Sequence, residues 1–220
     1  YDCLLLLDTV TSLGAVPLFL DEWKVDLAYS CSQKGLSCPP GLGPFTMGPR
    51  AEEKLAARTG KVPNWYLDVS LLNQYWGSDR VYHHTAPVNM NFGMREALRL
   101  IAEEGLENVW ERHRRNAEKL WAGLEAIGLH CHVPAELRLP TLTTVRIPEG
   151  VDGKAFTLHL LNKHGIEMGG GLGALAGKVW RIGLMGYNSR EDNVDLLLNL
   201  LEQELPAFRS ASPVAAAAAA

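Results

Sequence analysis

Residues 4–8 read LLLLD, and residues 25–34 read VDLAYSCSQK. Each stretch begins with a largely apolar run that has about the length of one β-strand. Strands that are buried on both faces, as in a parallel sheet covered by helices, carry such continuous runs. Gly14 and Pro17 mark a turn region between the two runs. We therefore predict two buried strands of an α/β fold, the first of which ends at Asp8.

Polar side chains follow both predicted strands. Asp8 closes the first run, and Lys34 lies in the polar loop after the second. Ligands of an open α/β sheet bind outside the carboxyl ends of its strands, so one crevice receives a carboxylate and an amine. A lysine forms a Schiff base with an aldehyde, and an aspartate keeps a pyridinium nitrogen protonated; pyridoxal 5'-phosphate (PLP) requires both groups. From the spacing alone, a solvated loop lysine is the alternative interpretation.

The composition is that of an ordinary globular protein. The 220 residues include 21 Lys and Arg against 25 Asp and Glu, which gives a formal net charge of −4. Without a strongly basic field we expect no nucleic acid and no anionic membrane surface as partner. No apolar run approaches the ~20 residues that span a bilayer, so we expect a soluble chain. The four cysteines lack CxxC spacing, which predicts free thiols in a reducing compartment.

Helices dominate the middle of the chain. Residues 49–58 predict a short helix with Pro49 at its first position. Long amphipathic helices begin near residue 87 and are interrupted at Gly105. The predicted buried face of the second long helix consists of Val109, His113, Ala117, Leu120, Leu124 and Ile127.

An α+β pattern follows Gly128. Asp152 is expected to cap a helix that runs to about residue 163. Ser189 is expected to cap a last helix that reaches Leu205. The strands predicted here cover residues 142–147, 166–168 and 178–184.

These patterns divide the chain into three parts. Residues 1–105 form an α/β part, residues 106–210 a linking helix and an α+β part, and residues 211–220 an alanine-rich tail of low complexity. The chain opens inside a run that has the pattern of a buried strand. We therefore expect an upstream part to precede Tyr1.

Three short motifs suggest a metal or a nucleotide but are interpreted otherwise. His83 and His84 are neighbours, which point to opposite sides of an extended chain and rarely share an ion. His130 and His132 share a strand face but lack further ligands, so we predict an exposed strand end and no metal. The glycine-rich stretch 169–173 is followed by a predicted strand and not by a helix, which favours a flexible turn over a dinucleotide loop.

Four longer motifs identify a family. They are LLLLDTVTSLGAVPLFLDEWKVDLAYSCSQKGLSCPPG (4–41), YHHTAPV (82–88), RLPTLTTV (138–145) and GGGLGALAGKVWRIGLMG (169–186). Together they resemble the class V aminotransferases of fold type I, within them the alanine–glyoxylate (serine–pyruvate) group. The resemblance implies a PLP-dependent α/β enzyme. The chain would hold part of the large domain, with its mostly parallel sheet, and the α+β C-terminal small domain. The N-terminal part of the family, more than a third of the enzyme, is missing.

The resemblance also assigns roles to single residues. Lys34 would bond the cofactor aldehyde and, once displaced by the substrate, move a proton between the substrate α-carbon and the cofactor. Asp8 would pair with the pyridine nitrogen, Val10 would pack on one face of the ring, and Gln33 would contact the phosphate.

Further site residues follow from the later motifs of the resemblance. Tyr82 and Thr85 would reach the cofactor phosphate of a partner subunit, so the resemblance implies a homodimer with shared active sites. Arg181 would grip the α-carboxylate of the substrate, because a guanidinium forms a planar two-point pair with a carboxylate.

The implied reaction is a ping-pong amino transfer from L-alanine or L-serine to glyoxylate or pyruvate, in the peroxisome or the mitochondrial matrix. The substrates would therefore be small amino acids and 2-oxo acids. Related enzymes of the class, 3-hydroxykynurenine transaminase and cysteine desulfurase, are alternatives. A desulfurase needs a nucleophilic cysteine, and Cys31 and Cys38 lie near Lys34 in sequence. A truncated, non-catalytic fragment that acts in dimerisation is the alternative from another class.

Overall fold

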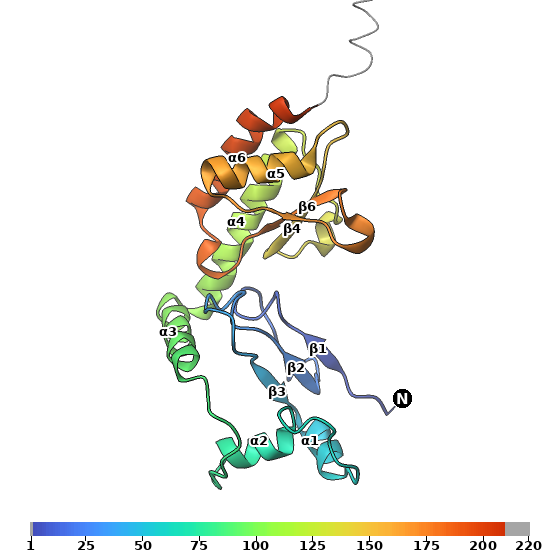
Figure 1. The fold of residues 1–220 in the computed structure, drawn as a ribbon, viewed down its shortest axis with the longest axis vertical. Helices are drawn as coiled ribbons and strands as arrows, with labels where there is room; N and C mark the ends of the chain where they lie inside the picture. The colour runs from blue at the N-terminus through green and yellow to red at the C-terminus, as the bar shows by residue number, and fades with distance from the viewer. Residues whose placement is uncertain (1, 210–220) are drawn as a thin grey trace, which may run out of the picture.

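The computed structural model describes residues 2–209, which form two lobes (Figure 1). The first lobe holds a three-stranded sheet of β1 (Leu6–Asp8), β2 (Leu27–Tyr29) and β3 (Phe45–Met47). Its helices are α1 (Pro49–Ala56), α2 (Val69–Trp76) and α3 (Val88–Glu104). The second lobe holds β4 (Leu142–Arg146), β5 (Gly169–Gly170), β6 (Val179–Gly183), α4 (Leu106–Ala126), α5 (Gly153–His164) and α6 (Glu191–Glu204).

The first sheet confirms the two strands predicted at the start of the chain. β1 and β2 pair in parallel, with Leu6 opposite Leu27 and Asp8 opposite Tyr29. β3 pairs antiparallel to β2 and was not predicted. The expectation that both strands are buried on both faces is wrong for β1, since Leu6 is 56% exposed. β1 is the edge strand of the sheet that residues 2–209 form, so it has a neighbouring strand on one side only.

The second lobe is built on an antiparallel sheet with the strand order β4, β6, β5. Helices α5 and α6 and the second half of α4 contribute to its core. The largest side chains that are buried there belong to Trp180 and Phe156, whose ring centroids lie 5.4 Å apart. This lobe confirms the predicted strand at 142–147, the strand at 178–184 and the α+β pattern.

Two local predictions in the second lobe are wrong. Residues 166–168 are not a strand; the short strand β5 begins at Gly169 instead, and Met168 is buried. Ser189 does not cap α6, because the residue before the helix is Arg190 and it makes no side-chain cap. By contrast, the carboxylate of Asp152 accepts a hydrogen bond from the Ala155 amide, which confirms the predicted cap of α5.

The helices that connect the lobes follow the predicted pattern. α3 ends at Glu104, and α4 begins at Leu106; Gly105 between them has a φ of +86°. The buried residues of α4 include Val109, His113, Ala117, Leu120 and Leu124, as the period of 3.6 residues predicts. The domain boundary at residues 105/106 stays a prediction, and the tail 211–220 lies outside the described residues.

No helix within residues 2–209 combines the length and the apolar character that crossing a membrane requires. All four cysteines are free thiols, as expected; Cys38 is buried and Cys3 is exposed.

Candidate functional site

The loops that follow β1 and β2 pack against each other. The amide of Thr9 donates to the carbonyl of Tyr29 over 2.9 Å, and the Ser30 hydroxyl donates to the Thr9 carbonyl, also over 2.9 Å. Farther along, Gly35 approaches the backbone so closely that a Cβ placed on it would lie 2.4 Å from the Leu13 carbonyl oxygen. These contacts bring the segment with Asp8 and Val10 next to the segment with Gln33 and Lys34.

Gly35 therefore provides a direct test of this packing. Gly35→Ala should lower the free energy of unfolding by about 1–3 kcal/mol, because the contact is with backbone that has to move. Gly60→Ala is the matched control, since its added Cβ would meet no atom within 4 Å. Urea denaturation of both full-length variants measures the difference. Equal stability of the two variants would show that the loops do not pack as described.

Asp8 is held in position by two hydrogen bonds. One carboxylate oxygen accepts from the Tyr29 hydroxyl over 2.7 Å, and the other accepts from the Val10 amide over 2.8 Å. The Tyr29 bond, followed by the Val10 amide, lowers the pKa of Asp8 below its ordinary value of 3.8. The carboxylate is exposed and has further lone pairs free, so it can accept a hydrogen bond from an N–H or O–H group of a ligand.

Tyr29 is a residue of this site that the sequence reasoning missed. It stands directly opposite Asp8 in the parallel register of β1 and β2. A signal was present in the sequence, because Tyr29 carries a hydroxyl and lies, with Ser30, at the end of the second apolar run. The same bond to Asp8 raises the pKa of the Tyr29 phenol above 10.0, so Tyr29 stays a hydrogen-bond donor at neutral pH.

Lys34 lies in a turn directly after the second strand. Its carbonyl accepts a hydrogen bond from the Ser37 amide over 3.0 Å, which closes the turn. The side chain is half-buried, and within residues 2–209 no carboxylate lies within 4.0 Å of its ammonium. The amine is therefore not engaged in an ion pair with the described residues. Gln33, the preceding residue, is exposed, and Val10 is half-buried.

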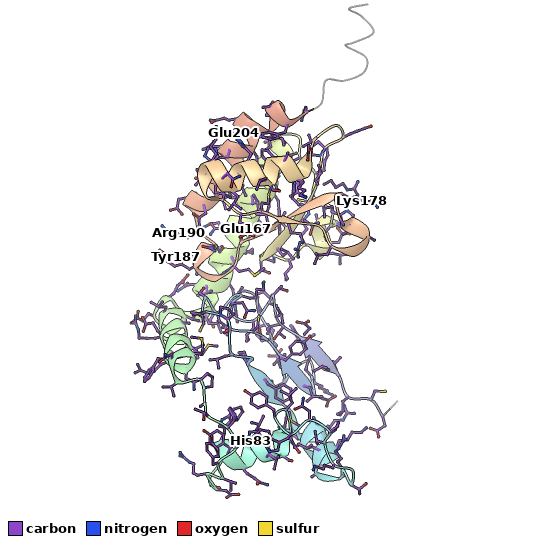
Figure 2. All side chains as sticks on the ribbon, viewed as in Figure 1. His83, Glu167, Lys178, Tyr187, Arg190 and Glu204 are labelled. Atoms are coloured by element: carbon purple, nitrogen blue, oxygen red, sulfur yellow. The ribbon has the colours of Figure 1, made fainter. Side chains whose placement is uncertain are left out.

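Tyr82 and Thr85 lie apart from this turn, on the segment after α2. Their hydroxyl oxygens are 3.1 Å apart, and Tyr82 is 70% exposed. His83 between them is buried and stacks on Trp65 with a centroid distance of 4.1 Å and an interplanar angle of 16°. Figure 2 shows His83 beside α2, on the side of the first lobe that faces away from the second lobe. Two hydroxyls on one exposed edge form a neutral donor pair of the kind that a phosphate accepts.

His83 and His84 do not point to opposite sides, so the prediction based on an extended chain is wrong. Their Nδ1 atoms lie 2.9 Å apart, because residues 81–83 are irregular and not an extended strand. His83 Nε2 is 3.1 Å from the Trp65 carbonyl, which can only accept, so this nitrogen carries a proton. The two rings thus bond each other and the backbone.

Arg181 lies on β6 of the second lobe. Its Nε donates to the Gly170 carbonyl over 2.6 Å, and Gly169 is its partner in the β5–β6 pairing. A Cβ on Gly170 would meet no atom within 4 Å, so there is open space at Gly170, whereas a Cβ on Gly171 would clash with the Leu175 carbonyl. No carboxylate within residues 2–209 lies within 4.0 Å of the guanidinium, which leaves its charge available for a ligand.

A hydrogen bond near Lys34 connects the two lobes. The amide of Tyr187, in the turn after β6, donates to the Ser37 hydroxyl over 2.7 Å. The strand with Arg181 thus leads into the turn that contacts the Lys34 segment. Tyr82 and Thr85 take no part in this arrangement. Backbone contacts hold the segment with Asp8 and Val10 against the segment with Gln33 and Lys34. An ionised carboxylate on one segment and a half-buried amine without an ion pair on the other fit the two groups that PLP requires.

One other cluster has metal-ligating side chains close together. Within residues 2–209, His159, His164 and Glu204 offer ligand atoms that lie within 4.8 Å of one another (Glu204 is labelled in Figure 2). The ammonium of Lys163 already bonds both oxygens of Glu204, over 2.8 and 3.1 Å. Lys163, His159 and His164 together lower the pKa of Glu204 to about 2. We interpret the cluster as an ion-pair network between α5 and α6, because its carboxylate already has a cation.

Comparison with known proteins identifies the family. Residues 1–197 match the family described as aminotransferase class-V. The chain is 47% identical over 210 residues to an alanine–glyoxylate aminotransferase of Callithrix jacchus, a match that covers 93% of this chain and 50% of the relative. The chain thus spans about half the length of the curated relatives it matches.

Two solved structures have the same fold. Alanine–glyoxylate aminotransferase of Nostoc sp. superimposes with a TM-score of 0.89 at 68% identity, covering 91% of this chain and 53% of that chain. Ureidoglycine–glyoxylate aminotransferase of Bacillus subtilis superimposes with a TM-score of 0.91 at 40% identity, covering 99% of this chain and 57% of that chain. The fold is that of the fold type I PLP-dependent transferases, as predicted. The chain belongs to the class-V aminotransferase family.

Proposed function

We propose that this chain carries the lysine, the ring-binding aspartate and the carboxylate-binding arginine of a PLP-dependent aminotransferase. The single observation that supports this most is the packing of the two loops that bring Asp8 and Lys34 to the same edge of the sheet. When bound, PLP supplies an electron sink that stabilises the carbanion formed at the substrate α-carbon. The 68% identity to the Nostoc sp. enzyme favours the same type of reaction.

Each of these residues has its own role in this proposal. Lys34 would hold the cofactor through its aldehyde carbon, and its amine would move a proton at the substrate α-carbon. Asp8, kept ionised by Tyr29 and the Val10 amide, would keep the ring nitrogen of the cofactor protonated. Val10 would pack on the ring face, and Gln33 would contact the phosphate.

We propose a homodimer in which Tyr82 and Thr85 serve the partner's site. Their exposed hydroxyls, 3.1 Å apart, and their position away from the Lys34 turn support this arrangement. Sedimentation of the full-length protein, combined with complementation between Lys34→Ala and Tyr82→Phe chains, tests it. A mixture of the two variants should recover activity that neither variant has alone. A fully active monomer would contradict the shared site.

The proposed substrates are L-alanine or L-serine as amino donor and glyoxylate or pyruvate as acceptor, in a ping-pong reaction. Glyoxylate occurs in the names of the Callithrix jacchus, Nostoc sp. and Bacillus subtilis relatives, and alanine in the names of the first two. Assay of the full-length protein with each donor against each acceptor tests the pair. Preference for ureidoglycine or 3-hydroxykynurenine over alanine would overturn the donor. The compartment, peroxisome or mitochondrial matrix, stays a prediction that imaging of the tagged protein tests.

The desulfurase alternative finds less support in the cysteines. Cys38 is only 4% exposed, and its sulfur lies 3.5 Å from the position of a Cβ on Gly93 of α3. Such a thiol cannot swing toward a substrate. Cys31 is half-buried and lies nearer to Lys34 in sequence. An assay for cysteine persulfide after incubation with L-cysteine distinguishes desulfuration from amino transfer. A non-catalytic fragment would show neither persulfide formation nor amino transfer.

Arg181→Ala tests the carboxylate site. Loss of a charge-assisted bidentate pair costs about 1.5–3 kcal/mol, so KM should rise about ten- to a hundredfold for every amino acid and 2-oxo acid substrate. Arg146→Ala, an exposed arginine of the neighbouring strand β4, is the matched control and should leave KM unchanged. Steady-state kinetics with alanine and with glyoxylate measure the change. An effect on alanine without an effect on glyoxylate would remove Arg181 from the carboxylate site.

A further inference from the structure

The turn after β6 lies between the Lys34 turn and α4. Gly186, with a φ of +58°, faces Ser37 so closely that a Cβ on it would lie 1.8 Å from the Ser37 hydroxyl. Ser37 has a φ of +58°, an uncommon conformation for a residue with a side chain, and its hydroxyl accepts the Tyr187 amide over 2.7 Å. This contact holds the 186–189 turn against Ser37, which lies three residues after Lys34 in the sequence. Figure 2 shows Tyr187 and Arg190 on the side of the second lobe that faces the first.

His113 of α4 bonds the same turn from the other side. Its side chain is fully buried, and the amide of Gly186 donates to His113 Nε2 over 2.8 Å. The other ring nitrogen, Nδ1, lies 2.7 Å from the Val109 carbonyl. A carbonyl only accepts and a backbone amide only donates, so Nδ1 carries the proton and Nε2 carries none. Both partners of the ring are satisfied only when His113 is neutral.

Other side chains of α4 donate hydrogen bonds to backbone carbonyls of the turn. Arg112 donates to the carbonyls of Gly186 and Ser189, over 2.9 and 2.7 Å, and also bonds Glu104 of α3. Asn116, which is buried, donates to the Ser189 carbonyl over 2.8 Å. The charged groups near the His113 ring are Arg112 and Glu104, while Tyr187 and Arg190 of the turn segment bond each other. Every contact holds the turn in one position.

We propose that neutral His113 is a positioning residue that holds the 186–189 turn against Ser37 and thereby sets the distance between Arg181 and Lys34. Arg181 lies on the strand that leads into this turn, and Ser37 lies in the turn that Lys34 begins. The two groups would bind opposite parts of one substrate–cofactor pair, so a shift of the turn misplaces the α-carbon relative to the amine. This inference rests on the proposed aminotransferase function.

Protonation of His113 releases the turn. A proton on Nε2 would face the Gly186 amide, so two donors would oppose each other in a buried space. Burial, with a smaller contribution from Arg112, lowers the pKa of His113 below its ordinary value of 6.5. The neutral form is therefore favoured in the folded protein. The stability that it contributes is present above pH 6.5 and is lost as the pH falls from there through the lowered pKa.

Two substitutions of His113 in the full-length, cofactor-loaded protein separate the effect of the hydrogen bond to the Gly186 amide from the effect of protonating His113. His113→Gln keeps an acceptor for the Gly186 amide and does not titrate, so its KM at pH 8 should stay within about threefold of the wild type. His113→Leu fills the space without an acceptor and should raise KM for alanine and glyoxylate about tenfold, the loss expected for one unsatisfied buried amide. His130→Leu, at an exposed histidine of the same lobe, is the matched control.

Hydrogen exchange of residues 184–190 and 34–38, followed by mass spectrometry, provides a readout that does not depend on activity. His113→Leu should increase exchange in both segments together. Ser37→Ala, which removes the acceptor on the other side, should do the same and serves if His113→Leu does not fold. Below pH 6.5 the wild type should exchange faster than His113→Gln at the same pH.

The outcomes are distinct. Loss of protection in 184–190 without any change in 34–38, or equal effects of His113→Leu and His113→Gln, would overturn the positioning role. A wild-type protein without transaminase activity whose two segments still respond together would overturn the proposed function and leave the mechanical coupling supported.

Discussion

We expect transamination to fall to background when Lys34 is replaced by alanine. Among the residues grouped at this edge of the sheet, Lys34 is the one with an amine, and only a neutral amine both bonds an aldehyde and carries a proton at neutral pH. The absorbance of the lysine-bound cofactor should disappear with the activity. Assay of alanine and glyoxylate turnover, together with the absorbance spectrum of the full-length variant, measures both.

Two further variants sharpen this test. Lys34→Arg should fail as completely as Lys34→Ala, because a guanidinium stays protonated and forms no bond with the aldehyde. Lys61→Ala, which changes an exposed lysine of the same lobe, should behave as the wild type. Near-normal turnover of Lys34→Ala would remove this residue from the reaction.

Asp8→Asn should preserve cofactor binding but slow the transfer of the α-proton. The asparagine carbonyl oxygen can still accept from the Val10 amide, and its NH2 group can donate to the Tyr29 hydroxyl oxygen, so the local structure should be maintained. Asparagine carries no charge to stabilise a protonated ring nitrogen, and removing a preorganised electrostatic partner typically costs about 100- to 1,000-fold in rate. Single-turnover measurements with L-alanine and with α-deuterated L-alanine, normalised to bound cofactor, quantify the step.

Tyr29→Phe is the control for Asp8. It removes the hydroxyl that lowers the pKa of Asp8 but leaves the carboxylate and the Val10 bond in place. The remaining carboxylate is still ionised at pH 7, so the loss of rate should be much smaller than for Asp8→Asn. Unchanged turnover of Asp8→Asn would mean that another residue contacts the ring nitrogen.

The sequence predicts the parts of this site that depend on strand order. Asp8 and Lys34 each follow an apolar run, and parallel strands present their carboxyl ends at one edge. The period of 3.6 residues likewise predicts the buried face of α4 and places His113 on it. These features depend on local pattern and on strand order, both of which can be predicted from a single sequence.

Tertiary hydrogen bonds decide what the sequence does not predict. Ser189 has the residue type of a helix cap, but its carbonyl is bonded by Arg112 and Asn116, more than 70 positions earlier in the chain. The stripe that contains His113 does not indicate that its ring holds the amide of Gly186. The exposure of Leu6 depends on which strands surround β1, which the apolar run itself does not specify.

The most direct test of the account is to locate the cofactor on the chain. Borohydride reduction of the full-length protein loaded with PLP makes the bond to lysine permanent, and trypsin does not cleave after a modified lysine. We predict a labelled tryptic peptide that spans residues 25–50, uncut at Lys34. Free peptides 25–34 and 35–50, with the label on another lysine or on none, would contradict the assignment of Lys34 and with it the proposed active site.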